Sequence, residues 1–484
     1  MRILHVVSEI YPLVKTGGLA DVAGALPAAQ ARLGADVRVL VPGYPQIQAA
    51  LTDVRTVASD ANLFHGGPAQ LREGTLKGVD VPAYVLDCAG LYWRAGSPYF
   101  DQTGHEWADN HRRFAALGWA AAQLAANADP DWQPDIVHGH DWQAGLGLAF
   151  IALRGGWRPG LVTTIHNLAF QGRFPASVVA DLGLSPQGFS MFGYEFHGDV
   201  SFLKAALYYA DRITTVSRTY AQEIQEPEQG FGLDGLLRSR AADLVGIVNG
   251  VDYDVWDPSR DSNLPRPFDR HDRSGKAEAK AELQRRMGLS VDPDQPLFVL
   301  VGRLTTHKGV HLLLEATPAL VASGAQLAVL GSGERDKEDG FRYAAGFHPG
   351  QVAAVIGFDE GLAHLFQGGA DVTLVPSLTE PCGLTQLYAM RYGSLPLVRR
   401  AGGLNDTVIN ADPGAIEAGT ATGFVFNDAT PQALAGTIGW AAGLYRDKAL
   451  WSRLQNTAMA QDFGWPNAAG EYLRLYHGLR PSVA

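Results

Sequence analysis

Short apolar runs rich in β-branched residues alternate with helical patterns along almost the whole chain. In the first half, helices are predicted between several of the strands, for example at residues 20–33 and 111–126. Strands that are apolar throughout and alternate with helices are typical of parallel sheets covered on both faces. The strands predicted in this half lie at residues 3–7, 37–41, 83–86, 135–138, 161–165, 212–216 and 245–248.

A polar stretch with several prolines, residues 252–296, interrupts this alternation and contains one charged helix at 276–287. The alternation then resumes, and the chain from Pro431 onward is mostly helical. At 484 residues the chain exceeds what one hydrophobic core usually holds, so two doubly wound α/β domains are expected. In this class ligands bind at the carboxyl ends of the strands. The strands predicted in the second half lie at residues 297–301, 326–330, 352–356, 372–375 and 395–398.

The charge balance and the cysteine content exclude several classes of protein. The 39 basic and 50 acidic side chains give a net charge of −11, which argues against a nucleic-acid or anionic-membrane partner. The two cysteines, Cys88 and Cys382, are too few for a disulfide framework and fit a reducing cytosol. The longest apolar stretches, 115–126 and 144–153, fall short of the roughly 20 residues of a membrane helix. A cytoplasmic protein without a targeting segment is therefore expected.

The loop after the first predicted strand contains Lys15, Gly17 and Gly18. Adjacent glycines let backbone N–H groups approach a phosphate or sugar, the following helix adds its positive end, and Lys15 adds a full charge. The glycine spacing is neither that of a dinucleotide fingerprint nor that of a P-loop. A plain tight turn remains the alternative to a ligand site.

Two further loops follow strands in the second half. Arg303 and Lys308 lie at a strand-to-helix junction, where two cations can converge on a diphosphate. Glu380 lies in the turn after residues 372–375, and Cys382, Gly383 and Leu384 are expected to open a helix whose free N–H groups face an anion. The alternatives are two solvated loop charges and a carboxylate that only caps the helix.

His138 and His140 suggest a metal site, because zinc hydrolases use this spacing. His166 is a further candidate ligand, but no recognisable remaining ligand set is present, so no metal is expected. Tyr99 and Trp142 are able to stack on sugar rings, although isolated aromatic residues are more often part of a core. The GSG at Gly331 lacks the third glycine of a nucleotide fingerprint.

Seven segments together resemble one known family. In order and spacing they are similar to bacterial glycogen synthase, the glucosyltransferase family shared with plant starch synthase, from residue 1 to about residue 480. The segments are KTGGLADV at Lys15, HDW at His140, TIHNLAFQG at Thr164, NGVD at Asn249, GRLTTHKG at Gly302, EPCGLTQLYAMRYG at Glu380 and GGLNDTV at Gly402.

The resemblance implies the GT-B fold, in which two Rossmann-like domains face each other across a deep cleft. The N-terminal, acceptor-side domain would cover residues 1–250, with the C-terminal helix 464–484 packing back on it. The nucleotide-sugar-binding domain would cover 251–463, with hinges near 252–256 and 463–466 that allow closure.

The resemblance also implies transfer of glucose from ADP-glucose to the non-reducing end of an α-1,4-glucan, with retention at the anomeric carbon. No metal or other cofactor is implied, and the partners are ADP-glucose and glycogen. A UDP-glucose-dependent relative, a nucleotide-sugar-binding protein without catalysis and a metal-dependent hydrolase at His138 and His140 remain alternatives.

The family's roles are carried over position by position. Lys15, Gly17 and Gly18 would hold the donor's phosphate and sugar, and Arg303 and Lys308 would neutralise the leaving ADP. The other implied roles are Glu380 near the transferred glucose, His166, Asp141 and Asn249 at its hydroxyls or its developing charge, Gly383 and Leu384 beside Cys382 at phosphate, and Tyr99 near the adenine or ribose.

Two positions depart from related patterns. Gln143 replaces the histidine that commonly follows HDW, which puts one sugar contact in doubt. Tyr388 stands where many related retaining transferases have a second glutamate, as it does in the synthase family. Because no second carboxylate is evident, same-face attack is preferred over a covalent glucosyl intermediate.

Overall fold

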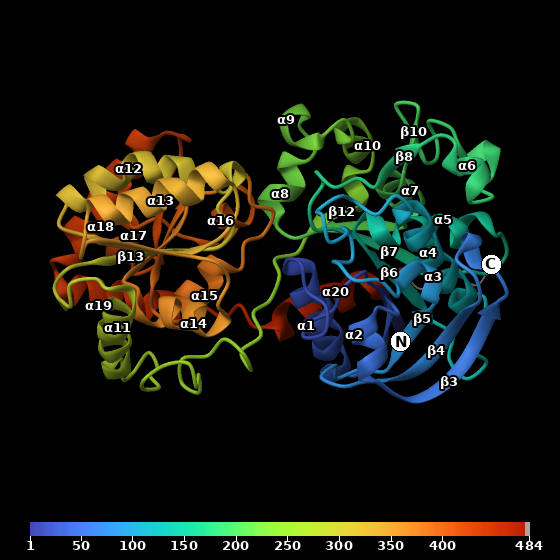
Figure 1. Ribbon diagram of the computed structural model, residues 1–484, viewed down its shortest axis with the longest axis horizontal. Helices are drawn as coiled ribbons and strands as arrows, with labels where there is room; N and C mark the ends of the chain where they lie inside the picture. The colour runs from blue at the N-terminus through green and yellow to red at the C-terminus, as the bar shows by residue number, and fades with distance from the viewer. Residues whose placement is uncertain (480–484) are drawn as a thin grey trace. The chain divides into compact units, whose positions relative to one another are not determined.

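The computed structural model describes residues 1–479, and these form two compact units (Figure 1). The first unit comprises Met1–Gly250 together with the segment from Trp465 onward, and the second comprises Val251–Gly464. The backbone passes between the units at Gly250 and again at Gly464. Residues 480–484 of the expected C-terminal helix lie outside the described residues.

The first unit is built on a nine-stranded sheet. Its strands from β12 to β5 run parallel, and they include all the strands predicted for this half with small shifts at their ends. The strand order is β12 (Leu244–Gly246), β11 (Arg212–Thr215), β7 (Gly160–Ile165), β6 (Ile136–His140), β1 (Arg2–Val6), β2 (Asp36–Pro42), β5 (Ala83–Asp87), β4 (Ala69–Leu76) and β3 (Leu51–Asp60).

The edge formed by β3 and β4 corrects the expectation of a wholly parallel sheet. β4 pairs antiparallel with both β5 and β3, and neither β4 nor β3 was predicted. In β4 the buried Ala69, Leu71 and Leu76 are separated by polar and charged residues, and most of β3 is exposed. Strands with one wet face lack the continuous apolar run by which the central strands were recognised.

Helices cover both faces of this sheet (Figure 1). α4 (Asn110–Ala125), α5 (Gly145–Leu153) and α7 (Phe202–Tyr209) pack against one another on one face, and α1 (Gly18–Arg32) packs with α20 (Trp465–His477) on the other. α20 is amphipathic, because its buried residues recur at helical spacing and include Tyr472 and Tyr476. The C-terminal helix thereby completes the core of the first unit.

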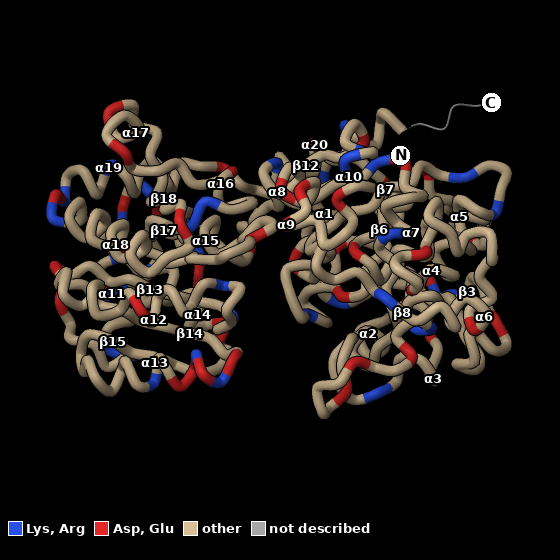
Figure 2. The backbone as a smooth tube through the Cα atoms, turned by 90° about the horizontal axis from the view of Figure 1, so that it is seen from above, with Lys and Arg blue, Asp and Glu red and all other residues tan. Residues whose placement is uncertain are grey.

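The second unit contains a six-stranded sheet that is parallel throughout. Charged residues, blue and red in Figure 2, are absent from β13, β14 and β16 in its middle, as expected for strands covered on both faces. β18 was not predicted. The strand order is β15 (Val352–Ile356), β14 (Gln326–Gly331), β13 (Leu297–Val301), β16 (Val372–Val375), β17 (Leu395–Arg399) and β18 (Phe424–Phe426).

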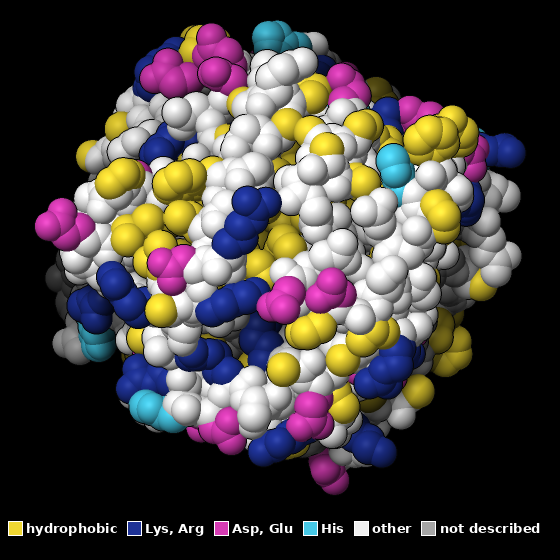
Figure 3. All heavy atoms as spheres, turned by 90° about the vertical axis from the view of Figure 1, so that its left-hand side faces the viewer, with side chains coloured by type: hydrophobic (Ala, Val, Ile, Leu, Met, Phe, Trp, Pro, Cys, Tyr) yellow, Lys and Arg dark blue, Asp and Glu magenta, His cyan; other side chains and the backbone are white. Residues whose placement is uncertain are grey.

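Helices also cover both faces of the second sheet (Figure 1). α12 (Val310–Ala322), α13 (Arg335–Phe347) and α18 (Pro431–Tyr445) lie on one face, and α11 (Ser274–Met287), α14 (Glu360–Gly369) and α15 (Thr385–Arg391) lie on the other. The charged helix predicted at 276–287 is α11. On the face of this unit shown in Figure 3, basic, acidic and hydrophobic side chains are interspersed.

The remaining elements are short, apart from the 12-residue helix α19 (Lys448–Met459), and three of the short strands form a separate small sheet. None of the described helices is both long enough and apolar enough to cross a membrane. These elements are α2 (Pro45–Ala50), η1 (Leu63–His65), α3 (Ala89–Tyr92), η2 (Trp142–Ala144), β8 (Arg173–Pro175), α6 (Val178–Asp181), η3 (Pro186–Gly188), β9 (Glu195–Phe196), β10 (Asp199–Ser201), α8 (Arg218–Glu223), α9 (Pro227–Gly230), α10 (Asp234–Ser239), η4 (Ala241–Asp243), η5 (Thr306–Lys308), α16 (Gly402–Thr407), α17 (Pro413–Ala418) and α19 (Lys448–Met459).

Candidate functional site

The glycine loop of the first unit lies between β1 and α1. Gly17 is the extended N-cap of α1, and Gly18 is the first helical residue. A Cβ atom built on either glycine has no described protein atom within 4 Å, apart from the adjacent residues and the backbone of its own helix, so packing within the unit does not require glycine here. Lys15 is held beside the start of the helix by Asp21, with 2.7 Å between Nζ and Oδ1.

Glu9 organises this loop, and the sequence reasoning gave it no role. Its side chain is buried and accepts hydrogen bonds from the backbone N–H and the hydroxyl of Thr16, the latter at 2.9 Å. The hydroxyl of Tyr99 also donates to Glu9 at 2.9 Å and bonds Ser8 Oγ at 2.8 Å. Burial raises the pKa of Glu9. The available signal was a carboxylate within an apolar run.

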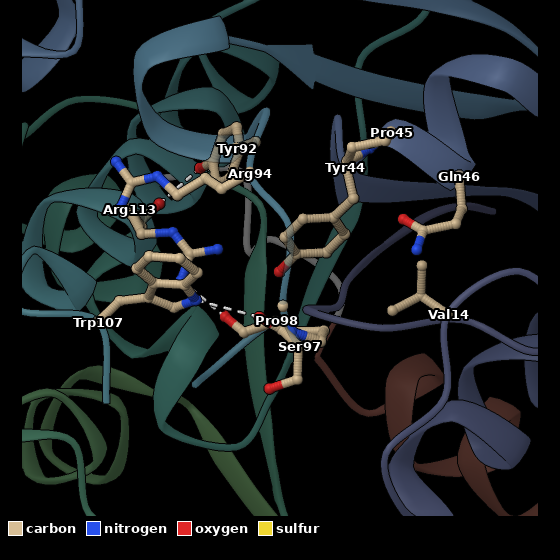
Figure 4. A pocket seen from close by; sticks show the side chains of 11 residues that line it. Val14, Tyr44, Pro45, Gln46, Tyr92, Arg94, Ser97, Pro98, Trp107 and Arg113 are labelled. Carbon is tan, nitrogen blue, oxygen red and sulfur yellow. Dashed lines mark hydrogen bonds between the residues drawn. The ribbon is translucent and has the colours of Figure 1, made fainter. Parts of the chain in front are cut away.

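Arg113, which is buried on α4, fixes the loop that carries Tyr99. Its guanidinium donates to the carbonyl oxygens of Leu91 and Pro98 at 2.9 and 2.7 Å. The hydroxyl of Tyr44 points into a small cavity beside this loop (Figure 4) and has no hydrogen-bond partner among the described residues. The cavity is lined by Val14, Tyr44, Pro45, Gln46, Tyr92, Arg94, Gly96, Ser97, Pro98, Trp107 and Arg113.

The histidines considered as metal ligands form a buried cluster that also contains His5 from β1. His140 bonds His166 through Nδ1 at 3.0 Å and His5 through Nε2 at 2.9 Å, and His138 bonds other side chains through both ring nitrogens. Ligand atoms of His5, His138 and His140 lie within 4.8 Å of one another. Because hydrogen bonds already use both nitrogens of each of these three rings, a metal ion would have to displace them. The geometry therefore favours a hydrogen-bonded cluster.

Asp141 directly follows β6 and adopts a positive φ of 56°, an unusual conformation for a residue other than glycine. Its buried carboxylate accepts a hydrogen bond from the backbone N–H of His166 at 2.7 Å, which joins the HDW and TIHNLAFQG segments. Burial raises the pKa of Asp141 to about 7. The structure thus brings Asp141 and His166 together.

Two buried amides of the first unit have unpaired oxygen atoms. Asn249 is 7% exposed and Gln143 is 5% exposed. Neither Asn249 Oδ1 nor Gln143 Oε1 has a hydrogen-bond partner in the described part of the chain. Buried polar atoms are usually paired, so such an atom in a native fold needs an explanation, and a ligand hydroxyl is one.

In the second unit the structure joins two of the predicted site residues directly. The Lys308 ammonium lies 2.5 Å from Glu380 Oε2, and Ser377 Oγ donates to the same oxygen at 2.8 Å. Glu380 is buried, whereas the Lys308 side chain is 32% exposed. These two contacts fix the position of the Glu380 carboxylate.

Two glycines allow the loops that carry Lys308 and Glu380 to pack closely against neighbouring backbone. Gly309 has a φ of 68°, and a Cβ atom there would lie 1.9 Å from the carbonyl oxygen of Pro376. The N–H of Leu378 donates to the carbonyl of His307 at 2.9 Å, which ties the Lys308 loop to the end of β16. On the other side, a Cβ atom on Gly402 would lie 2.0 Å from the carbonyl oxygen of Glu380. The GGLNDTV segment therefore supports the carboxylate turn.

The turn after Glu380 differs from the prediction. Cys382, Gly383 and Leu384 do not open the helix, because α15 begins at Thr385 with Leu384 as its N-cap. Gly383 has a φ of 74°, which a right-handed helix does not contain, and Gln386 Nε2 donates to the carbonyls of Cys382 and Gly383 at 3.1 and 2.9 Å. Cys382 is buried and forms no disulfide bond.

Two further residues are placed less centrally. Arg303 follows β13 and is exposed. Its carbonyl oxygen accepts a hydrogen bond from the Thr305 N–H at 3.1 Å, and its side chain forms no hydrogen bond or ion pair with the described residues. The Tyr388 ring stacks on Trp256 at a centroid distance of 4.1 Å, and Trp256 stacks on His364 at 3.8 Å. Tyr388 therefore lies at one end of a stack of three rings, with Trp256 in the middle and His364 at the other end.

Comparison with known proteins gives matches over both units. Residues 2–239 match the starch synthase catalytic domain family, and residues 284–445 match glycosyl transferases group 1. A glycogen synthase of Edwardsiella ictaluri is 52% identical over 481 residues, covering 99% of this chain and 100% of that protein. A glycogen synthase of Paramagnetospirillum magneticum is 49% identical over 482 residues, with 99% and 98% covered.

Solved structures match over nearly the full length as well. The catalytic domain of Starch Synthase IV from Arabidopsis thaliana, bound to ADP and acarbose, has a TM-score of 0.88 and 32% identity, with 98% of both chains covered. A sucrose-phosphate synthase of Thermosynechococcus elongatus shares the fold at 18% identity and a TM-score of 0.59, with 99% of this chain and 98% of that chain covered.

Proposed function

Because this chain belongs to the glycogen synthase family of glucosyltransferases, we propose that it transfers glucose from ADP-glucose to the non-reducing end of an α-1,4-glucan. The predicted family, enzyme class and GT-B-like fold of two α/β domains are confirmed by the relatives. ADP-glucose, the glucan acceptor, the retained anomeric configuration and the roles of single residues belong to the proposal. Cys88 and Cys382 are both buried and form no disulfide bond, which favours a cytoplasmic reaction.

The observation that carries the proposal is the arrangement of Lys308, Glu380 and Ser377 in the second unit. Cleavage of the glucose-phosphate bond leaves negative charge on ADP and positive charge on the sugar ring. We assign Lys308 and Arg303 to the leaving diphosphate and Glu380 to the glucosyl group. A cation about 4 Å from a unit negative charge contributes about 4 kcal/mol at an effective dielectric constant of 20.

Residues of the first unit are assigned to the donor's phosphate and sugar. The open space beside Gly17 and Gly18 leaves their backbone N–H groups accessible to an anion, and Lys15 adds a charge at the start of α1. Since no contact within the protein explains these two glycines, contact with a ligand is the better explanation. Tyr99 is assigned to the adenine or ribose through its ring, because its hydroxyl is already bonded to Glu9.

Three polar residues of the first unit are assigned to the glucosyl group. His166 and Asp141 are joined by a hydrogen bond, and the unpaired Oδ1 of Asn249 is able to accept a sugar hydroxyl. In the second unit, the backbone of Gly383 and Leu384, beside Cys382, is assigned to phosphate. We further assign acceptor binding to the first unit and nucleotide-sugar binding to the second.

The proposed chemistry is same-face attack within an ion pair. Lys308 and Ser377 hold Glu380 as a charged group that stabilises the glucosyl cation, and Tyr388 is packed against Trp256. A covalent intermediate would require a carboxylate to attack the anomeric carbon directly. Isolation of a glucosyl ester on Glu380 from a quenched reaction would overturn this assignment.

Incorporation of labelled glucose into glycogen tests the activity. Purified protein would receive glycogen, EDTA and either ADP-glucose or UDP-glucose. Incorporation from ADP-glucose in the presence of EDTA is expected. Preference for UDP-glucose would reject the donor assignment, loss of incorporation with EDTA would support a metal-dependent reaction, and binding without incorporation would indicate a protein that has lost catalysis.

A further inference from the structure

A continuous row of hydrogen bonds leads from His166 into the interior of the first unit. His166 Nε2 lies 3.0 Å from His140 Nδ1, and His140 Nε2 lies 2.9 Å from His5 Nδ1. His5 Nε2 lies 2.7 Å from Gln30 Oε1 on α1. His140 and His5 each use one ring nitrogen for the preceding bond and the other for the following bond, so the row passes through both rings.

The row continues through the C-terminal helix. Gln30 Nε2 donates to the Tyr476 hydroxyl at 3.2 Å, and this hydroxyl lies 2.7 Å from His138 Nδ1. His138 Nε2 lies 2.6 Å from Thr164 Oγ1, and Thr164 Oγ1 lies 2.6 Å from Thr214 Oγ1. Tyr476 thus links α20 to β6 and to the middle of the sheet.

A backbone carbonyl at the far end fixes the direction of the row. Thr214 donates its only hydroxyl proton to the carbonyl oxygen of Thr163 at 3.3 Å, because a carbonyl only accepts. Thr164 must then donate to Thr214, and His138 Nε2 must donate to Thr164. The Tyr476 hydroxyl accordingly donates to His138 Nδ1.

The four histidines transmit this direction because they are neutral. Burial lowers the pKa of His5 to about 4 and that of His166 to about 3, and it lowers the pKa values of His138 and His140 well below the ordinary value. A neutral imidazole has one donor and one acceptor nitrogen, so each ring passes the direction to the next. The orientation of Gln30, with its oxygen toward His5, agrees with the direction set at Thr163.

We propose that this row holds His166 in the tautomer that carries its proton on Nε2, so that Nδ1 is an acceptor for a hydroxyl of the donor sugar. His5, Gln30, His140 and Tyr476 are positioning residues that act through His166. The proposal rests on the proposed function for the identity of the sugar, whereas the tautomer is a property of the protein alone.

The first test reads the tautomer directly by NMR of protein labelled with ¹⁵N-histidine, with His166 assigned through H166Q. The wild type is expected to show His166 as the Nε2–H form alone. In Tyr476→Phe, Gln30 loses the partner that orients it and is free to turn its amide, so a second His166 tautomer is expected. A wild-type signal for the Nδ1–H form, or an unchanged single tautomer in Tyr476→Phe, would overturn the proposal.

Tyr472→Phe is the matched control. Tyr472 lies one turn earlier on α20 and its ring also contacts His138, with 5.5 Å between centroids, but its hydroxyl is not a member of the row. The control is expected to keep the single His166 tautomer. If Tyr472→Phe also showed the second tautomer, the effect would come from altered packing of α20, and the proposal that the Tyr476 hydroxyl acts through the hydrogen-bonded row would be rejected.

The second test uses ADP-glucose analogues in which one sugar hydroxyl is replaced by fluorine, which accepts but does not donate. The wild type is expected to discriminate against one analogue in kcat/KM, and Tyr476→Phe is expected to lose about three- to tenfold of this discrimination, the range of one hydrogen bond. Equal discrimination in both proteins would overturn the sugar contact. Absence of transfer from any donor would reject the proposed function and leave the NMR result standing.

Discussion

The two units position their polar site residues by different physical means. In the first unit the residues around His166 are buried and form a row of neutral hydrogen-bonding groups. In the second unit Lys308 and Glu380 carry formal charges, and the Lys308 side chain remains 32% exposed. Burial of a neutral polar group costs little free energy when its hydrogen bonds are made, whereas burial of a charge costs much more unless the charge has a partner or access to water.

The glycines of the site loops also differ between the two units. Gly17 and Gly18 in the first unit face open space, so the fold does not require them. Gly309, Gly383 and Gly402 in the second unit have positive φ angles, and a Cβ atom at each would overlap protein atoms. The first unit therefore uses glycine to expose backbone, and the second uses it to bring the Lys308 and Glu380 loops together.

The largest expected effect concerns the charged pair. Glu380→Gln is expected to lower kcat by about 100- to 1,000-fold, since one group aimed at transition-state charge contributes about 2.7–4 kcal/mol. Glucose incorporation from ADP-glucose measures it. Glu360→Gln, at an exposed position on α14 of the same unit, should retain wild-type turnover. A Glu380→Gln enzyme within threefold of wild type would remove the carboxylate from the mechanism.

Asp141 tests whether the first unit tolerates charge. Because its pKa rises from 3.8 to about 7 on folding, the unfolded chain loses this proton first, and the free energy of unfolding falls as pH rises between these values. Asp141→Asn should therefore stabilise the unit at pH 8 by about 2–4 kcal/mol and should not do so at pH 4. Urea unfolding at both pH values measures the difference. A stabilisation that is equal at both would contradict the pKa assignment.

His5 is expected to give a pH dependence of stability opposite in sign to that of Asp141. Its pKa falls from 6.5 to about 4 on folding, so the unfolded chain binds more protons and the free energy of unfolding falls as pH drops from 6.5 toward 4. His5→Gln should flatten this dependence by about 1.4 kcal/mol per pH unit. Denaturant titrations at pH 5 and pH 6.5 compare the slopes, with exposed His105→Gln as control. Identical slopes in His5→Gln and wild type would mean that His5 does not remain neutral.

The smallest expected effect separates the two kinds of glycine. Gly17→Ala should leave the melting temperature unchanged, since the residue is extended and its Cβ position is open, and should lower activity about tenfold by obstructing the ligand. Gly383→Ala should lower the melting temperature, because its φ is 74° and a Cβ would lie 2.4 Å from Gln386 Oε1. Thermal denaturation and activity on both variants test this. Full activity in Gly17→Ala would favour a plain turn.

Local sequence patterns predicted the central strands and the site loops, but not the edge strands of the first sheet or the turn at Gly383. The central strands and the loops that carry Lys15, Lys308 and Glu380 were recognised, because parallel strands have continuous apolar runs and their loops follow directly. The β3–β4 hairpin was not, since its alternating polar residues resemble a loop. Cys382 was placed in a helix because the left-handed conformation of Gly383 gives no local signal.

The sequence by itself determined the succession of the central strands and their helices, the family and the loops in which the polar motifs lie, because each depends on residues that are close together in the chain. Only the tertiary structure decided that Glu9 organises the glycine loop and that Tyr476 reaches His138, 338 positions away. It also decided which nitrogen of His166 carries a proton. Hydrogen-bond direction belongs to a whole row of groups, and the folded core alone assembles that row.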